Sequence, residues 1–349
     1  MRQRPHALVA GAILLALSSC ISTGPSTIAQ QRGSYTEVIS ETDKEELLTN
    51  IVRLAYLDAP VFFQVASVTA QPSVEYGTPD SDIKLGDGSS PNPLVLAKPR
   101  VLIKDAPTIV YKPLSGKEFS SELLMPIDIR PAFLMLDNGF DFSVIAQLLF
   151  KSMNGLSNSR NASPQERERF RACTDAIARM MNRGQIQVGT PKDGLQQAGG
   201  RLEVQIAPAA FETDDGKLVA QALGLDPARE TYALRSGLGG DAGTIAIAPR
   251  SLLALLSYLS NYVQPPVEHA SITWPTDARG ESDSLMTILS SRERPTNADP
   301  LVFHEGFWFY VRADDLRSRN TLFLLRLLFN LQADGGAIDN TLQLTLPLR

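Results

Sequence analysis

The first twenty residues of the chain predict the cellular compartment in which the remainder folds. Arg2 and Arg4 form a basic head, residues 7–17 are an apolar run, and two serines lie directly before Cys20. This order of basic head, short apolar run and small residues is typical of a cleaved secretory signal peptide. An apolar run of eleven residues is too short to span a bilayer, which takes about 20 residues.

Cys20 stands where a bacterial lipobox places its modified cysteine. We therefore expect removal of residues 1–19 and attachment of a diacylglycerol, with palmitate among the acyl chains, to the Cys20 thiol. The alternative is an ordinary cleaved signal in which Cys20 stands by chance. Ile21 follows, where an Asp would indicate retention in the inner membrane, so the sequence favours the outer membrane.

Composition describes an ordinary globular protein and excludes one class of partner. The chain from Cys20 to Arg349 has 330 residues, and 43% of the whole sequence is hydrophobic. Loss of Arg2 and Arg4 changes the formal net charge from −5 to −7. An acidic chain without Lys/Arg clusters lacks the electrostatic footprint of a nucleic-acid-binding protein. Because no polybasic patch is present either, attachment to a membrane has to be covalent.

Cys173 is the only other cysteine, so we expect no structural disulfide once Cys20 carries lipid. It shares a helical face with Phe170, Ile177 and Met180 at spacings of three and four residues. This pattern favours core packing of the thiol. A nucleophile or an intermolecular disulfide is the alternative.

The pattern of apolar residues predicts an α+β protein, with mixed strands and helices in one globular body after a signal peptide and a flexible tether. The tether covers residues 20–39, the body covers residues 40–349, and a sub-boundary is possible at 158–163. Helices are expected at 40–55, 119–124, 132–136, 142–153, 163–182, 251–263 and 322–331. Strands are expected at 61–68, 108–111, 185–188, 202–206, 232–234, 244–248, 285–289, 301–303, 307–311 and 342–346, and a long loop or hairpin tip at 72–99.

Templates for cofactor and metal sites do not fit this sequence. Residues 115–117 (Ser-Gly-Lys) lack the upstream Gly and the following Ser or Thr of a phosphate-binding loop. The glycines of 237–243 precede a strand, whereas a dinucleotide fingerprint opens a helix, so we expect a flexible hairpin loop there. Asp80, Asp82 and Asp87 do not have calcium-loop spacing. We therefore expect no cofactor and no metal.

Catalytic templates fit no better, and no catalytic residue is assigned. The best support for an enzyme is the group His304, Glu305, Asp314 and Asp315, but the pattern favours a solvated hairpin turn for His304 and Glu305 over a catalytic base. Next to it, Phe307 and Phe309 point to one side of a predicted strand, and Trp308 and Tyr310 point to the other. We expect core packing on both sides; the alternative is that the side with Trp308 and Tyr310 forms an interaction surface.

Four segments resemble a group of uncharacterised lipoproteins of Gram-negative bacteria: NIVRLAYLDAPVFFQVASV at 50–68, PTIVYKPLSGKEFSSELLMPI at 107–127, KSMNGLSN at 151–158, and FWFYVRADDLRSRNTLFLLRLLFNLQ at 307–332. The resemblance spans most of the chain after Cys20. It implies a cell-envelope location and one co-folded unit, and it transfers no catalytic residue.

The sequence therefore favours a lipid-anchored cell-envelope protein that acts as a non-catalytic binding or assembly module. Its partners would be the membrane, through the N-terminal lipid, and other envelope proteins, with no nucleic acid among them. The alternative is a hydrolase or another enzyme on the periplasmic side with an unrecognised site.

Replacing Cys20 tests the lipid anchor. Two or more acyl chains give stable anchoring because each buried methylene contributes about 0.8 kcal/mol. We expect the wild type to incorporate radiolabelled palmitate, and Cys20→Ser to lose the label and to be poorly processed or soluble in the periplasm. An unlabelled, soluble wild-type protein would rule out the anchor.

Overall fold

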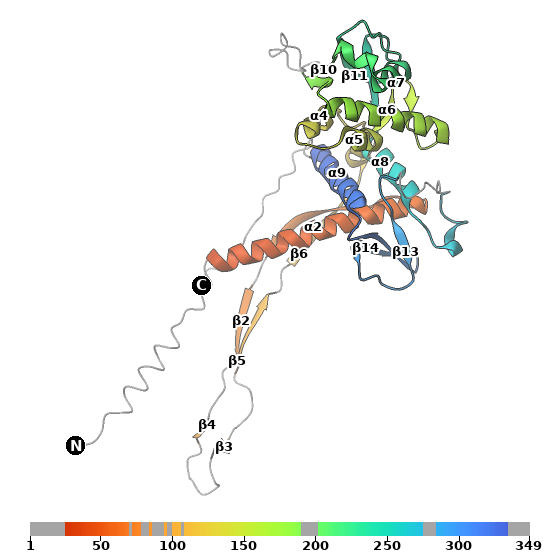
Figure 1. The fold of residues 1–349 in the computed structure, drawn as a ribbon. Helices are drawn as coiled ribbons and strands as arrows, with labels where there is room; N and C mark the ends of the chain where they lie inside the picture. Colours follow the sequence, from red (N-terminus) through yellow and green to blue (C-terminus); the bar gives the residue numbers. More distant parts are fainter. Residues whose placement is uncertain are drawn as a thin grey trace, which may run out of the picture. The chain divides into compact units, whose positions relative to one another are not determined.

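The computed structural model describes residues 25–69, 72–77, 84–85, 94–95, 100–105, 108–189, 202–274 and 284–333. Cys20, the three aspartates of the rejected calcium loop and the strand expected at 342–346 lie outside these ranges. Helices and strands are interspersed without regular alternation, so the α+β class is confirmed (Figure 1). Within the described ranges, no helix combines the length and apolar character needed to cross a bilayer.

Contacts divide the chain into two compact units, each built from two separate stretches. Unit 1 is Met1–Tyr56 with Ser260–Arg326, and unit 2 is Leu57–Leu259 with Leu327–Arg349. The possible boundary at 158–163 falls inside unit 2. That residues 40–349 fold as one body in solution stays a prediction.

Unit 1 is organised around the long helix α2 (Pro25–Ala55). Its apolar positions Leu48, Ile51 and Val52 are fully buried, and the helix packs against strand β14 (Ala298–His304). Polar contacts fix it further: Lys44 Nζ lies 2.7 Å from Asp299 Oδ1, and Arg326 of α9 (Leu316–Ala333) binds α2 through the Ser40 and Asp43 side chains. Strands β13 (Leu289–Ser291) and β15 (Phe307–Arg312) and the short 3-10 helices η2 (Ser260–Tyr262) and η3 (Val267–His269) complete the unit.

Helix α2 begins at Pro25, earlier than the start near Ser40 expected from the sequence. Part of the expected tether, residues 25–39, is therefore helical. Proline is tolerated in the first turn because the N–H that it lacks would have no partner within the helix, and no other proline interrupts the segment before Ala55.

Unit 2 contains a six-stranded sheet in the order β8-β7-β12-β11-β10-β9. All neighbours are antiparallel except β11 and β12, which are parallel. The strands are β7 (Phe150–Met153), β8 (Leu156–Ser157), β9 (Ile186–Gly189), β10 (Leu202–Ile206), β11 (Thr231–Ser236) and β12 (Thr244–Pro249).

Helices of unit 2 enclose a common apolar core with this sheet. Side chains from α4 to α7 and from β7 and β9 to β12 line one cavity there. The helices of unit 2, apart from the end of α9, are α3 (Lys117–Leu124), α4 (Arg130–Asp137), α5 (Phe142–Leu149), α6 (Pro164–Asn182), α7 (Asp214–Leu223) and α8 (Leu252–Leu259), with the 3-10 helix η1 (Pro208–Glu212).

Unit 2 also contains a nested series of strand pairs between residues 62 and 114. Strand β1 (Phe62–Thr69) pairs with β6 (Thr108–Leu114), β2 (Pro72–Gly77) with β5 (Arg100–Asp105), and β3 (Lys84–Leu85) with β4 (Leu94–Val95), all antiparallel. Of the two expectations for 72–99, the hairpin is the one that these strands support.

The glycine-rich segment 237–243 is not the hairpin loop expected from the sequence, because the strands that it joins are parallel. It has to return the chain along β11 in seven residues, which is shorter than usual for a parallel connection. Gly237 and Gly239 have φ of 137° and 79°, a region that favours glycine. A Cβ on Gly240 would lie 1.9 Å from Asn154 Oδ1, so a larger residue there would displace this side chain from its hydrogen bonds.

A buried arginine holds the centre of unit 2 together. Arg250, 3% exposed, follows β12, and its guanidinium lies 3.8 Å from the centroid of the Tyr258 ring of α8. The Arg250 Nη1 donates to the carbonyl oxygens of Gln147, Leu148 and Phe150, and Nη2 donates to that of Asn158. The first three of these carbonyls lie in the last turn of α5 or directly after it. The helix expected at 142–153 therefore ends at Leu149, and Phe150 begins strand β7.

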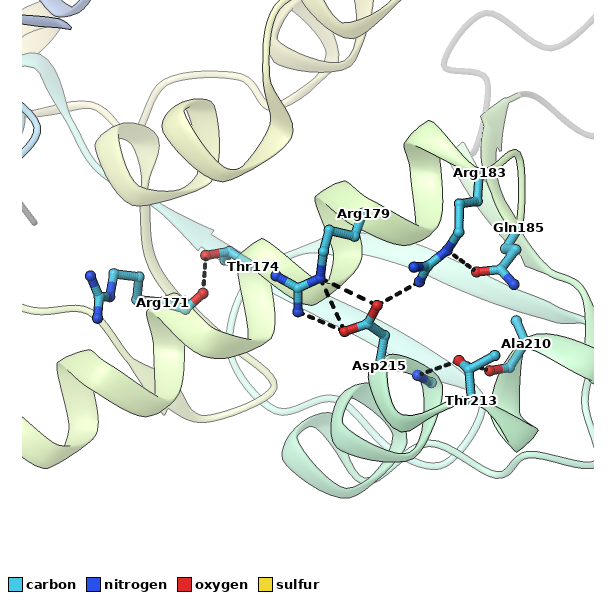
Figure 2. A network of polar contacts seen from close by, with 9 residues as sticks. Arg171, Thr174, Arg179, Arg183, Gln185, Ala210, Thr213 and Asp215 are labelled. Carbon is cyan, nitrogen blue, oxygen red and sulfur yellow. Dashed lines mark hydrogen bonds and ion pairs between the residues drawn. The ribbon is translucent and has the colours of Figure 1, made fainter.

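A second polar network joins α6 to α7 (Figure 2). Asp215, in the first turn of α7, lies 2.6 Å from Arg179 Nη2 and 2.5 Å from Arg183 Nη2, and both arginines come from the end of α6. Hydrogen bonds from Arg179 and then from Arg183 lower the pKa of Asp215 to about 2. The network therefore stabilises the contact between the two helices whenever Asp215 is ionised.

Lowering the pH should remove this stabilisation. The folded pKa of Asp215 is depressed from 3.8 to about 2, so its contribution is complete above the unfolded pKa and is lost as the pH falls through the folded pKa. We expect Asp215→Asn to lower the free energy of unfolding by about 1 kcal/mol at pH 7, because the arginines are half-exposed and screened. Urea unfolding of both proteins should show the difference shrinking between pH 5 and pH 2; a constant difference would contradict the assignment.

Candidate interaction surface

The strands that carry the predicted aromatic stripe form the three-stranded sheet β13-β15-β14 of unit 1. A two-residue turn, Glu305-Gly306, joins β14 to β15, and both residues have positive φ, 46° and 83°. Such turns match the twist of paired strands, so His304 lies opposite Phe307, and the hairpin expected here is confirmed.

One face of this sheet is core. Phe307, Phe309 and Val311 alternate along β15 and are at most 7% exposed. The ring centroid of Phe309 lies 5.9 Å from that of Tyr56, which directly follows α2. This face is therefore covered by α2 and the residue after it.

The opposite face is partly open, so core packing on both sides does not hold. Phe303 is 59% exposed, and Trp308 and Tyr310 are half-buried. Pairing places Phe303 next to Trp308 and Leu301 next to Tyr310, with Leu289 and Ser291 of β13 on the other side of β15. We call this set of six residues the aromatic face.

Two contacts give the aromatic face its shape and charge. The rings of Phe303 and Trp308 meet edge to face, with centroids 5.0 Å apart and planes at 60°. The guanidinium of Arg294, an exposed residue, lies 5.3 Å from the centroid of Trp308. The aromatic face is therefore a largely apolar surface with the Arg294 cation at its border.

The two histidines that follow Cys20 in the sequence both meet Tyr56. Its hydroxyl lies 2.7 Å from His269 Nδ1, and its ring centroid lies 4.9 Å from that of His304. Burial, and then the charge of Glu305, raise the pKa of Tyr56 to about 12. The Tyr56 hydroxyl is therefore protonated at neutral pH. The half-buried cluster of Tyr56, His269 and His304 resembles a packing contact more than a site with an activated catalytic base.

The group suggested as an enzyme site does not converge. His304 and Glu305 lie at the turn of the β14–β15 hairpin, whereas Asp314 and Asp315 follow its other end, about 17 Å along the strand. Asp314 pairs with Arg312, 2.6 Å away, and Asp315 caps α9 by accepting from the Ser318 N–H at 3.1 Å. Both carboxylates thus have structural roles.

Cys173 is fully buried in α6, as its helical pattern predicts. Burial raises the pKa of its thiol to about 12, so the thiolate is not populated at neutral pH. The alternatives of a nucleophile or an intermolecular disulfide find no support in this environment.

The cavity in the core of unit 2 has a volume of about 30 Å³ and only apolar side chains in its lining. A water molecule there would have no polar partner, so the cavity stays dry. Its size and lining fit a gap in core packing, not a catalytic pocket. Among the described residues, no group of three His, Cys, Asp or Glu side chains is placed to hold a metal ion.

Comparison with protein-family models, with curated proteins and with solved structures finds no match to this chain. The resemblance to Gram-negative lipoproteins therefore stays a prediction.

Removing the Tyr56 hydroxyl tests whether this cluster is structural. Tyr56→Phe keeps the ring and loses only the hydrogen bond to His269, so we expect the free energy of unfolding to fall by about 0.5–1.5 kcal/mol. His269→Ala should make the further effect of Tyr56→Phe much smaller, which a double-mutant cycle measures. Full additivity of the two changes would contradict the contact.

Proposed function

We propose that this chain is a lipid-anchored protein of the bacterial cell envelope that acts as a binding or assembly module, and that the aromatic face binds another envelope protein. The observation that carries the proposal is the contact between exposed Phe303 and half-buried Trp308, with Arg294 at its border. Tryptophan, tyrosine and arginine are the residues that most often dominate protein–protein binding energy.

Helix α2 connects the expected lipid anchor to the unit that carries the aromatic face. Helix α2 begins five residues after Cys20 and would be about 46 Å long at 1.5 Å per residue. Its far end, at Ala55, packs in the same unit as the aromatic face. A helix of this length supports presentation of the face to a protein partner at a distance from the lipid.

A protein partner suits the aromatic face better than a charged polymer or a small polar ligand. The surface is open and apolar, and the acidic chain carries no cationic clusters that would attract a nucleic acid. The carboxylates suggested for an enzyme have structural partners instead of a shared site. These contacts favour the binding module over the hydrolase.

Photo-crosslinking in intact envelopes tests the proposal. A photoreactive phenylalanine analogue at position 303 should give a discrete adduct, whereas the same analogue at Phe323, 54% exposed on α9, should not. With the captured protein purified, Phe303→Ala should raise its Kd at least about tenfold, which corresponds to 1.4 kcal/mol.

Phe323→Ala is the matched control and should leave this Kd unchanged. Both phenylalanines are more than half exposed, so neither substitution should affect folding strongly. Equal adducts at both positions, or an unchanged Kd for Phe303→Ala, would contradict the role of the aromatic face.

A further inference from the structure

A different part of the chain, in unit 2, has the geometry of an assembly element. Strands β1 and β2 pair with β6 and β5 in a single register: Thr69 lies opposite Thr108 and Pro72 opposite Asp105, so both sides advance by three residues. We call these four strands the β-arm.

The root of the β-arm is fixed in unit 2. Phe62, at the start of β1, is fully buried. Its ring stacks on Phe329 of α9 with centroids 5.3 Å apart, and meets Phe119 of α3 at 5.6 Å. The base of the β-arm is therefore well packed.

Each described sheet of the β-arm consists of two strands, so each strand has one edge that faces its partner and one edge that does not. In the described residues, β1–β6 and β2–β5 are each two-stranded sheets. A two-stranded ribbon is marginally stable in water, and a third strand is the usual remedy. Every second N–H and C=O along an edge points away from the existing partner and is available to a further strand.

The bulge and the interior proline of these strands lie at the root. Strand β1 has a bulge between Val65 and Ser67, and Pro113 interrupts the donors of β6. In contrast, β2 after its first residue and the whole of β5 pair without a bulge and contain no proline. The edges open to a neighbour are therefore those of β2 and β5.

We propose that a second copy of this chain occupies these edges, so that β2 of one copy pairs with β5 of the next in a head-to-tail array. Charge selects this combination: β2 carries one charged residue, Glu75, whereas β5 carries Arg100, Lys104 and Asp105, a net positive charge. In the β2–β5 register Glu75 lies opposite Leu102, so Arg100 and Lys104 occupy the two diagonal positions next to it on the same face.

Direction and register also suit this arrangement. Strands β2 and β5 run antiparallel within one copy, so copies in the same orientation place β2 of one antiparallel to β5 of its neighbour. Both strands have six residues and already pair along their whole length, with Val74 opposite Ile103. In the array, one edge of β5 would pair with β2 of its own copy, and the other edge would pair with β2 of the neighbouring copy in the same register. This inference requires neither the lipid anchor nor the aromatic face.

Cysteine cross-linking between differently tagged full-length copies tests the array. Copies with Val74→Cys and copies with Ile103→Cys, expressed together, should give a mixed dimer, and each variant alone should give at most a tenth of that yield. Cys173 is buried and Cys20 is present in every copy, so the wild type and each single variant under the same oxidation supply the background. Lys217→Cys, on exposed α7, replaces Val74→Cys as the matched control and should give no mixed dimer.

Exchanging charges between two sets of copies distinguishes a contact between copies from a structural role of Glu75 within one copy. Glu75→Arg should raise the dissociation constant of the oligomer at least tenfold in analytical ultracentrifugation, and adding Lys104→Glu copies should restore assembly. A monomeric wild-type protein, self-linking of Val74→Cys, or adducts with a different protein only would overturn the proposal.

Discussion

The Arg250 guanidinium is the interaction on which the core of unit 2 depends most. It ends α5, fixes the start of β7 and stacks on α8, so two stretches about one hundred residues apart in sequence meet at one side chain. Arginine suits this position because its planar group remains charged and offers five donors in a fixed geometry. Carbonyl groups at the end of a helix carry partial negative charge, which suits a buried cation. Asn158 reinforces the site by donating to the carbonyls of Gln147 and Phe150.

Local signals predicted the parts of the fold that local interactions determine. Helix α6 begins with the capping box of Ser163 and Glu166 and ends just before Gly184, because both boundaries depend on residues within one turn. Strand β10 and the β14–β15 hairpin were predicted for the same reason. Helix α7 was missed although Thr213 caps its start and Gly224, with φ of 65°, ends it. Those two residues were the signal that could have identified it.

Long-range contacts determined what the sequence could not predict. The end of α5 depends on Arg250, about one hundred residues away, and no local pattern in 142–153 indicates it. The meeting of Tyr56 with His269 spans 213 residues, so neither residue could be placed in a common site beforehand. The parallel order of β11 and β12 escaped prediction because a seven-residue connection normally indicates a hairpin. For the aromatic face, alternation gave the two sides of β15, but only the packing of α2 decided which side is core.

Unit 1 is built from two stretches that are far apart in sequence, so it cannot complete its folding until the second stretch has been synthesised. Helix α2, with its buried Leu48, Ile51 and Val52, is synthesised before strand β14, against which it packs and which follows only after the intervening 203 residues of unit 2. At ordinary rates of synthesis this interval lasts roughly 10–40 s. During it, α2 displays an apolar stripe that its own partners cannot yet cover. A nascent chain with this topology is a natural client for a holding chaperone until its last third has been synthesised.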